Sequence, residues 1–228
     1  MPSNSNLPLP EVHPYGDSAF LITFGELIDP LANQCVYQLE AWLGEGKMAG
    51  VVEFIPAFIS LMVVYDPLVI DADRLVAWLQ QKMATCPWES DQAHRLIEVP
   101  VIYGGEDGLD LETVARINQL TPEEVITLHS QVVYTVAMMG FTPGFVYLSG
   151  MDARLATPRL ASPRTKVQPG SVGIAGSQTG IYSITSPGGW QIIGRTPLVL
   201  FDPKREKPFL FSPGDHVRFV PLLPGGNA

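Results

Sequence analysis

From residue 132 to residue 222 the sequence is a series of short runs rich in β-branched, aliphatic and aromatic residues, separated by glycine and proline. The runs include VVYTVAMMG, FVYLSG, GSVGIAG, GIYSITS, WQIIG, PLVLFD and HVRFVPL. Short strands at this spacing are typical of a barrel or a sandwich rather than of a parallel sheet. We therefore expect a β-barrel with long, glycine-rich loops in this part of the chain.

The first 94 residues combine strand-like and helix-like patterns. Strands are expected over 17–24, 50–56 and 58–65, and a second helix is expected to begin at Asp71. The first helix begins at Asp29-Pro30, which supplies an N-cap and a first-turn proline. Its apolar residues recur every four positions and place a cysteine on the buried stripe: Leu31, Cys35, Leu39 and Leu43.

This order of strands and helices is that of a split βαβ, ferredoxin-like unit, which a strand near 95–101 could complete. The fold class is then α+β. A small ferredoxin-like α/β domain covers residues 1–94, including a linker over 85–94, and the β-barrel domain covers residues 95–228. Two more helices are expected before the strand-rich part, one capped by Asp110 and one opened by a Thr121 to Glu124 capping box and ending near His129.

Composition excludes several classes of protein. Of the 228 residues, 46% are apolar and 16% charged, enough to bury a substantial core. No apolar run approaches the ~18–20 residues of a spanning helix, and the N-terminus has no signal-peptide pattern, so we expect no membrane association. Cys35 and Cys86 stand too far apart in sequence for a metal knuckle or a redox pair, which favours a reduced, cytoplasmic setting.

The charges are unevenly distributed along the chain. Residues 1–140 contain 5 basic and 19 acidic residues, whereas residues 141–228 contain 9 basic and 4 acidic ones. A net charge of −9 argues against nucleic acid as a partner. The basic part is expected to meet an anion or an acidic surface, the alternative being that its cations only solvate that part of the chain.

The stretch GFTPGFVYL, residues 140–148, is the densest motif of the chain. Pro143 stiffens it, Gly144 turns it, and Phe141 and Phe145 offer flat apolar faces to a substrate or a partner. The alternative is an aromatic hairpin that packs into the barrel's own core.

Arginines and glycine-rich turns follow this motif. Arg159 and Arg164 stand in PRLASPR, and Arg195 follows later, and each could chelate a carboxylate or a phosphate unless it serves in a surface salt bridge. Two glycine-rich turns could nest an anion through backbone N–H groups. They are PGSVGIAG, with Gly170 and Ser171, and SPGGW, with Gly189 and Trp190.

Catalytic signatures are otherwise sparse. His129 is the only well-placed base in the second half, although a histidine in a helix is more often structural, and His216 is expected in an exposed turn. Ser171 is not in a G-x-S-x-G elbow, no Walker A loop occurs, and no cluster of residues has the spacing of metal ligands, so we predict no metal site.

These motifs, in this order, resemble one family: the B subunit of ATP-dependent 5-oxoprolinase, also called allophanate hydrolase subunit 1 or the KipI family. The likeness spans about residues 15–225 and rests on YGG–GLDL, the helix ending in His129, GFTPGFVYL, the PR–PR pair, PGSVGIAG, PGGW, IGRTP and PGD–VRF. The chain departs from the family at two places. Where members have GPDL, this chain has Gly108-Leu109-Asp110-Leu111, and the loop Lys166–Pro169 before GSV also differs.

The resemblance implies a cyclophilin-like β-barrel for residues 95–228 and a heteromeric 5-oxoprolinase that also contains C and A subunits. Such an enzyme opens the lactam of 5-oxoproline to glutamate at the expense of ATP. Without a nucleotide motif, this chain is expected to be inactive alone. Relatives form the carboxyltransferase part of urea carboxylase or inhibit a sensor histidine kinase, and these remain alternative functions.

The enzyme hypothesis gives each candidate residue a role. Arg159, Arg164 and Arg195 would clamp carboxylate or phosphate, and His129 would handle a proton. Ser171 and the flanking backbone at Gly170 would be oxyanion donors. The remaining candidates would bind substrate, exclude water or meet the C subunit: Phe141, Pro143, Gly144, Phe145, Gly189 and Trp190.

Overall fold

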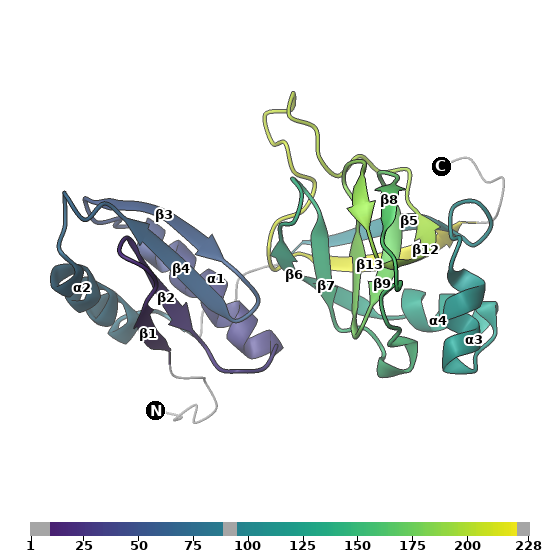
Figure 1. Cartoon of the computed structure of the whole chain (residues 1–228), viewed down its shortest axis with the longest axis horizontal. Helices are drawn as coiled ribbons and strands as arrows, with labels where there is room; N and C mark the ends of the chain where they lie inside the picture. The colour runs from purple at the N-terminus through teal and green to yellow at the C-terminus, as the bar shows by residue number, and fades with distance from the viewer. Residues whose placement is uncertain (1–9, 89–94, 223–228) are drawn as a thin grey trace. The chain divides into compact units, whose positions relative to one another are not determined.

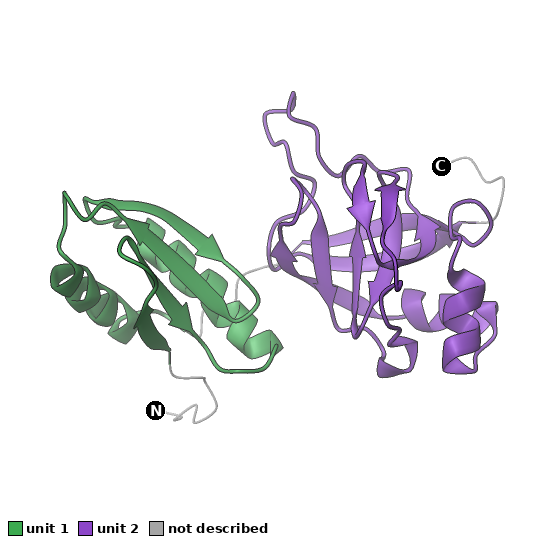
Figure 2. Ribbon diagram, in the orientation of Figure 1, with its two compact units in different colours: residues 1–93 green, residues 94–228 purple. Residues whose placement is uncertain are grey.

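A computed structural model describes residues 10–88 and 95–222. The chain divides into two compact units, residues 1–93 and residues 94–228 (Figure 2). Most of the linker expected over 85–94 lies outside the described residues. Within the described ranges, no helix has both the length and the apolar character needed to cross a membrane.

The first unit is an antiparallel sheet of four strands with two helices (Figure 1). Both helices begin where the sequence predicts, because the Asp29 carboxylate accepts hydrogen bonds from the Leu31 and Ala32 N–H groups and Asp71 accepts one from the Arg74 N–H. The elements are β1 (Glu11–Pro14), β2 (Ala19–Thr23), α1 (Pro30–Gly44), β3 (Val51–Pro56), β4 (Ser60–Tyr65) and α2 (Ala72–Ala84).

The core of this unit forms where the apolar stripes of the helices meet one face of the sheet. Ile22 and Leu61 from the strands and Leu39 from α1 are fully buried in it. Cys35 lies in the same core, and burial raises the pKa of its thiol to about 11, so it is protonated and inert at neutral pH. The prediction that Cys35 is a core residue is confirmed.

The strand predicted near 95–101 does not complete this sheet. It is β5 (Leu96–Tyr103), and it belongs to the barrel of the second unit. The sheet order is β1-β2-β4-β3, so the edge beside β2, where a ferredoxin-like unit would place its last strand, is occupied by β1. The expectation about this strand was wrong because an apolar run predicts a strand but not its pairing partner.

The second unit is a closed barrel of seven strands in the order β10-β7-β6-β13-β5-β12-β9. Neighbouring strands are antiparallel except β5 and β13, which pair in parallel from Leu96↔His216 to Ile102↔Leu222. The barrel strands besides β5 are β6 (Val133–Met139), β7 (Val146–Ser149), β9 (Ser171–Ala175), β10 (Gln178–Ile181), β12 (Gln191–Arg195) and β13 (His216–Leu222).

Other elements of this unit pack on the barrel. The helix α3 (Leu111–Asn118) and the helix α4 (Pro122–Ser130) pack against each other and contact β12 and β13 respectively. The capping box of α4 forms as predicted, with the Glu124 N–H donating to Thr121 Oγ1 and the Thr121 N–H donating to the Glu124 carboxylate. A separate two-stranded sheet joins β8 (Arg164–Val167) to β11 (Ser186–Gly188), and a 3₁₀ turn covers Ala153–Leu155.

One run predicted as a strand is a loop. Residues 197–202, PLVLFD, form no strand and make only an isolated bridge between Phe201 and Phe209. The segment from β12 to β13 instead rises above the barrel as a long excursion (Figure 1). Pro197 cannot donate to a ladder, which explains why the apolar run does not continue β12.

Candidate functional site

Three predicted site residues line one hollow of the barrel unit. The hollow has a volume of about 230 Å³ and lies between the loop before α3, the strand β8 and the adjoining ends of β9 and β12. We call it the Arg164–Arg195 hollow. Its lining residues are Glu106, Asp107, Leu109, Arg164, Lys166, Val167, Gln168, Ser171, Ile192 and Arg195.

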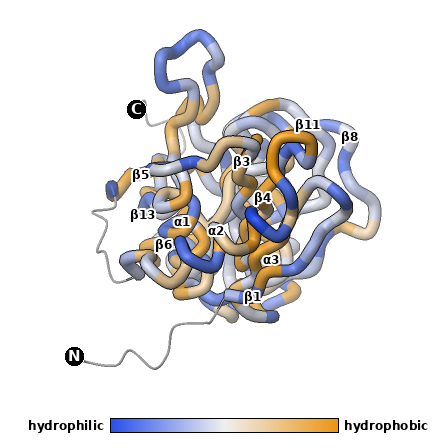
Figure 3. The backbone as a smooth tube through the Cα atoms, turned by 90° about the vertical axis from the view of Figure 1, so that its left-hand side faces the viewer, coloured by the Kyte–Doolittle hydropathy of each residue, from blue (hydrophilic) through white to orange (hydrophobic). Residues whose placement is uncertain are grey.

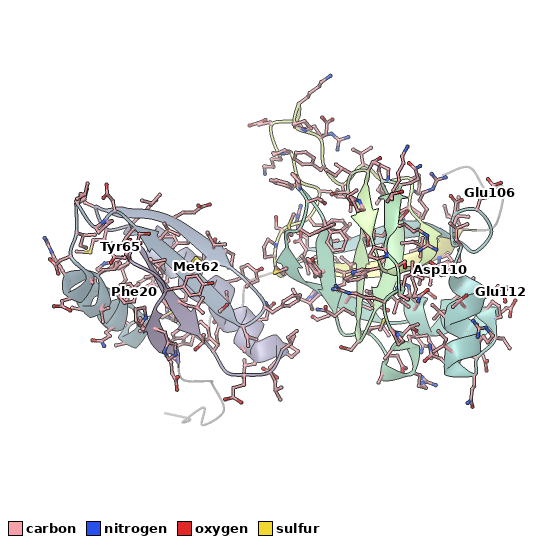
Figure 4. The ribbon with its side chains drawn as sticks, viewed as in Figure 1. Phe20, Met62, Tyr65, Glu106, Asp110 and Glu112 are labelled. Carbon is pink, nitrogen blue, oxygen red and sulfur yellow. The ribbon has the colours of Figure 1, made fainter. Side chains whose placement is uncertain are left out.

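Arg164 is fixed by a carboxylate that the sequence predicted to cap a helix. Its guanidinium donates to Asp110 Oδ1 at 2.7 Å and to the Trp190 carbonyl at 3.4 Å. The other oxygen of Asp110 accepts from the Ile192 N–H at 2.6 Å, so the side chain makes no cap to α3. Figure 4 shows Asp110 against the strands, inward of Glu106 and Glu112. The pair therefore ties β8 to β12 and to the start of α3.

Arg195 is paired as well. Its Nε lies 2.6 Å from Asp107 Oδ1, and the Arg195 side chain stays 47% exposed. Lys166 lines the same hollow and has no ion pair among the described residues. The hollow therefore contains three cations whose charge is largely offset by Asp107, Asp110 and Glu106, instead of the unopposed positive charge that the distribution of basic residues suggested.

The glycine-rich turn before β9 shapes the hollow but offers no anion nest. Gly170 has a φ of +81°, and a Cβ there would lie 2.2 Å from the Thr196 carbonyl oxygen. Its N–H donates to the Tyr182 carbonyl at 2.7 Å, and the Ser171 N–H donates to the Gln168 carbonyl. These two N–H groups are thus used within the fold, and the expectation that they serve as oxyanion donors is not supported by their geometry. Ser171 contributes its side chain to the wall.

Arg159 does not line the Arg164–Arg195 hollow. It is exposed, five residues before β8, and its charge acts on the phenols of Tyr147 and Tyr182. Burial raises the pKa of both phenols, and Arg159 opposes that shift. Arg159 therefore acts electrostatically on two tyrosines, which contact Phe145 in an aromatic cluster.

That cluster contains Phe145 and Trp190. Both are buried, with ring centroids 5.6 Å apart in an edge-to-face arrangement, and Tyr182 lies 4.9 Å from Phe145. Trp190 covers Gly173 and Gly180, where a Cβ would be 3.1 to 3.2 Å from its side chain. Gly189 accepts a hydrogen bond from the Leu160 N–H at 2.8 Å. Phe145 and Trp190 hence pack into the protein itself, but in a cluster separate from the barrel core that the alternative for the aromatic motif named.

The loop between β6 and β7 holds the remaining candidates. Phe141 is 62% exposed, whereas Gly144 is buried with a φ of +78° and has no room for a Cβ, which would lie 2.7 Å from Phe201 Cβ. The Pro143 carbonyl accepts a hydrogen bond from the Ser183 hydroxyl at 2.5 Å. The loop is therefore fixed by its own contacts, and Phe141 is the aromatic ring that it presents to solvent.

His129 lies in the barrel core. Thr179 donates to the Gly173 carbonyl, so its hydroxyl accepts from His129 Nε2 at 2.9 Å, and Tyr103 donates to Nδ1 at 2.8 Å. The ring stacks on Phe219 at 4.4 Å. Burial lowers the pKa of His129 to about 3. The histidine is a neutral, doubly bonded core residue, and it is not among the residues that line the hollow.

Sequence reasoning missed the acidic members of the site. Glu106, Asp107 and Asp110 stand in the run EDGLDLE directly after a Gly-Gly turn, and this acidic run was the available signal. Within the described ranges no three His, Cys, Asp or Glu side chains gather as metal ligands would.

Comparison with known proteins gives the following matches. Residues 10–211 match the family model described as carboxyltransferase domain, subdomain C and D. The chain is 46% identical to the 5-oxoprolinase B subunit of Bacillus subtilis over 92% of each chain, and 48% identical to that of Escherichia coli O157:H7 over 92% of this chain and 95% of the relative. The crystal structure of TTHA0988 superposes with a TM-score of 0.80 at 37% identity, covering 92% of this chain and 41% of that longer chain.

Proposed function

Because the chain belongs to the family of 5-oxoprolinase B subunits, within the carboxyltransferase domains of subdomains C and D, we propose that the Arg164–Arg195 hollow binds the carboxylate of 5-oxoproline. The chain is one component of a multi-subunit, ATP-dependent 5-oxoprolinase. The observation that carries the assignment of the hollow is that Lys166, Arg195 and Ser171 line one concave site.

The chemistry of the substrate fits this lining. 5-Oxoproline combines one carboxylate with a neutral five-membered lactam. Lys166, which has no ion pair among the described residues, and Arg195, whose guanidinium also pairs with Asp107, would hold the carboxylate against the charge of Glu106 and Asp107. Ser171 would add a polar contact, and Leu109, Val167 and Ile192 supply apolar wall for the ring. Holding the carboxylate fixes the ring and so orients the lactam carbonyl for reaction. Arg164 would act indirectly, by fixing β8 through its ion pair with Asp110. Lys166 and Arg195 would contact the substrate carboxylate directly.

We propose that ATP binds outside this hollow. Hydrolysis of an unstrained lactam is unfavourable in free energy when it is not coupled to another reaction. Phosphorylation of the amide oxygen by ATP would make the lactam carbon a better electrophile. Triphosphates are commonly held by free backbone N–H groups and by cations, whereas here the Gly170 and Ser171 N–H groups are bonded within the fold and the carboxylates of Glu106 and Asp107 line the hollow. The residues of this hollow thus do not fit the triphosphate. We assign nucleotide binding to the partners in the complex, of which the C and A subunits of 5-oxoprolinase are the proposed ones.

The two cysteines support the cytoplasm as the proposed compartment. Cys35 and Cys86 are both buried and unbridged. A chain that leaves buried thiols unpaired is typical of a reducing environment.

The test is a substitution series in the reconstituted complex. Lys166→Met and Arg195→Ala should each lower kcat/KM for 5-oxoproline at least about tenfold, which corresponds to ~1.4 kcal/mol of lost binding. The measurement is 5-oxoproline-dependent ATP hydrolysis, with the C and A subunits each omitted in turn. Arg164→Ala is unsuitable as a first test, because it leaves the buried Asp110 carboxylate without its partner.

Arg218→Ala is the matched control. Arg218 is 45% exposed and pairs loosely with Glu98 at 3.6 Å, so it resembles Arg195 in exposure but lies on β13, outside the lining. It should leave kcat/KM unchanged. Normal kcat/KM in both Lys166→Met and Arg195→Ala would remove the hollow from the reaction.

A further inference from the structure

A second hollow shares Arg195 with the first. Its volume is about 370 Å³, and Arg195 is the one charged residue among its lining residues. The others are Ile102, Pro169, Ser183, Thr196, Pro197, Leu198 and Val199. A mostly apolar hollow with a single guanidinium fits an apolar group that is accompanied by a carboxylate.

The β6–β7 loop adjoins this hollow. Ser183 lines the hollow and also donates to the Pro143 carbonyl. Gly144 packs against Phe201, and the Phe201 ring stacks on Phe209 with centroids 5.1 Å apart. Figure 1 shows the loop beside the base of the excursion between β12 and β13. The loop, the excursion and the second hollow therefore form one continuous surface, which we call the loop face.

Apolar side chains project from the loop face. Phe141 is 62% exposed, Val199 53% and Phe209 45%. Rings that stand out from a surface cannot be enclosed by a small ligand, but they can insert into a second protein surface. Exposed aromatic residues beside an arginine are the residue types that dominate binding at protein interfaces.

The backbone at Phe141 is strained. Its φ is +69°, and the Thr142 N–H donates to the Gly140 carbonyl at 2.8 Å, so the three residues form a γ-turn centred on Phe141. A bulky residue with positive φ costs of order 1–3 kcal/mol and persists only where its surroundings impose it, typically at ligand clamps. Here the Phe145 carbonyl, which accepts from the Gly140 N–H, and the Ser183 hydroxyl hold the loop. The exposed ring is thus pre-organised for contact.

The charges beside the loop face indicate its partner. The tip of the excursion, residues 202–207, is hydrophilic and its two stems are apolar (Figure 3). Its cations are Lys204, Arg205 and Lys207, and its carboxylates are Asp202 and Glu206, which leaves a net charge of +1; Arg205 pairs with Asp202. Lys204 and Lys207 have no ion pair among the described residues, and their charge favours a partner that carries carboxylates around an apolar residue.

We propose that the loop face docks an acidic loop of another protein of the oxoprolinase complex, with an apolar side chain in the second hollow and Phe141 inserted into the partner. This inference rests on the proposed function, because it takes its partner from the multi-subunit enzyme. Since Arg195 lines both hollows, the docked partner lies next to the proposed substrate carboxylate.

The test titrates the C and A subunits of the enzyme into the full chain and its variants, following complex formation by sedimentation. Phe141→Gly removes the ring while keeping a residue that adopts positive φ without strain, so folding is preserved. It should raise the partner concentration for half-maximal assembly at least tenfold, and excess partner should restore turnover. Phe209→Ser should act in the same direction. Ile117→Ala, on α3 and 44% exposed, is the control and should change nothing.

Two outcomes would overturn the proposal. One is an unchanged half-maximal concentration in both Phe variants. The other is an association of the unmodified proteins that does not weaken as ionic strength rises, because an acidic partner on a basic face is screened by salt. Failure of the proposed function is a separate result: the wild-type complex would assemble, yet would hydrolyse no ATP in response to 5-oxoproline.

Discussion

At the scale of single residues, partners far apart in sequence decide what a side chain does. The motifs singled out Arg164, Ser171 and Arg195, and the structure brings all three to one hollow. The aspartates that neutralise the arginines could not be predicted as partners, because Arg164 and Asp110 lie 54 positions apart and meet only once β8 lies beside β12. For the same reason the sequence could not show that Arg159 stands outside the hollow.

His129 yields a prediction about pH. Its folded pKa of about 3 lies below the unfolded value near 6.5, so the unfolded chain takes up a proton that the folded chain does not. The stability contributed by the neutral ring is complete above pH ~6.5 and is lost as the pH falls, at up to ~1.4 kcal/mol per pH unit. His129→Gln should flatten the slope of unfolding free energy against pH between 6 and 4, measured by urea denaturation.

The control lies in the same series above pH 7, where the His129 imidazole is neutral in both the folded and the unfolded chain, so the unmodified chain and His129→Gln should have the same slope. If their slopes are also equal between pH 6 and 4, the buried, neutral state of His129 is not what the stability of the barrel depends on.

At the scale of elements, sequence patterns predicted correctly those features that depend on residues a few positions apart. The caps at Asp29 and Asp71 and the box at Thr121 form as expected, because capping involves residues two or three positions apart. Asp110 is of a residue type that commonly caps helices. Its carboxylate instead accepts hydrogen bonds from the Ile192 N–H and the Arg164 guanidinium, so it does not cap α3. β1 was missed because its four residues, EVHP, contain no apolar alternation.

Turns of the barrel give a matched pair of glycine substitutions. Gly170 and Gly176 both have positive φ, at +81° and +57°, but only Gly170 lacks space for a Cβ. Gly176→Ala should cost ~1 kcal/mol of unfolding free energy through backbone strain alone, and Gly170→Ala at least ~3 kcal/mol because the Thr196 carbonyl must also move. Urea denaturation of both variants checks this, and equal costs would show that the turn before β9 relaxes freely.

At the scale of the whole molecule, the two units have separate cores. Within residues 10–88 and 95–222, the cluster around Leu39 and the one around Phe219 have no residue in common. We therefore expect a chain of residues 95–228 to fold alone, with the near-ultraviolet circular dichroism of a packed aromatic interior, and a chain of residues 1–94 to do the same. Summed spectra of the two pieces should reproduce that of the intact chain, and an unfolded piece would show that the proposed boundary at 94/95 is misplaced.

The parallel pairing of β5 with β13 has a consequence for biosynthesis. β5 ends at Tyr103 and β13 begins at His216, so the ribosome must add more than one hundred residues before β5 meets its main neighbour. At ~5–20 residues per second, this delay is on the order of ten seconds. During that interval the nascent barrel keeps an open β edge, so this is the stage at which a holdase chaperone would protect the chain most.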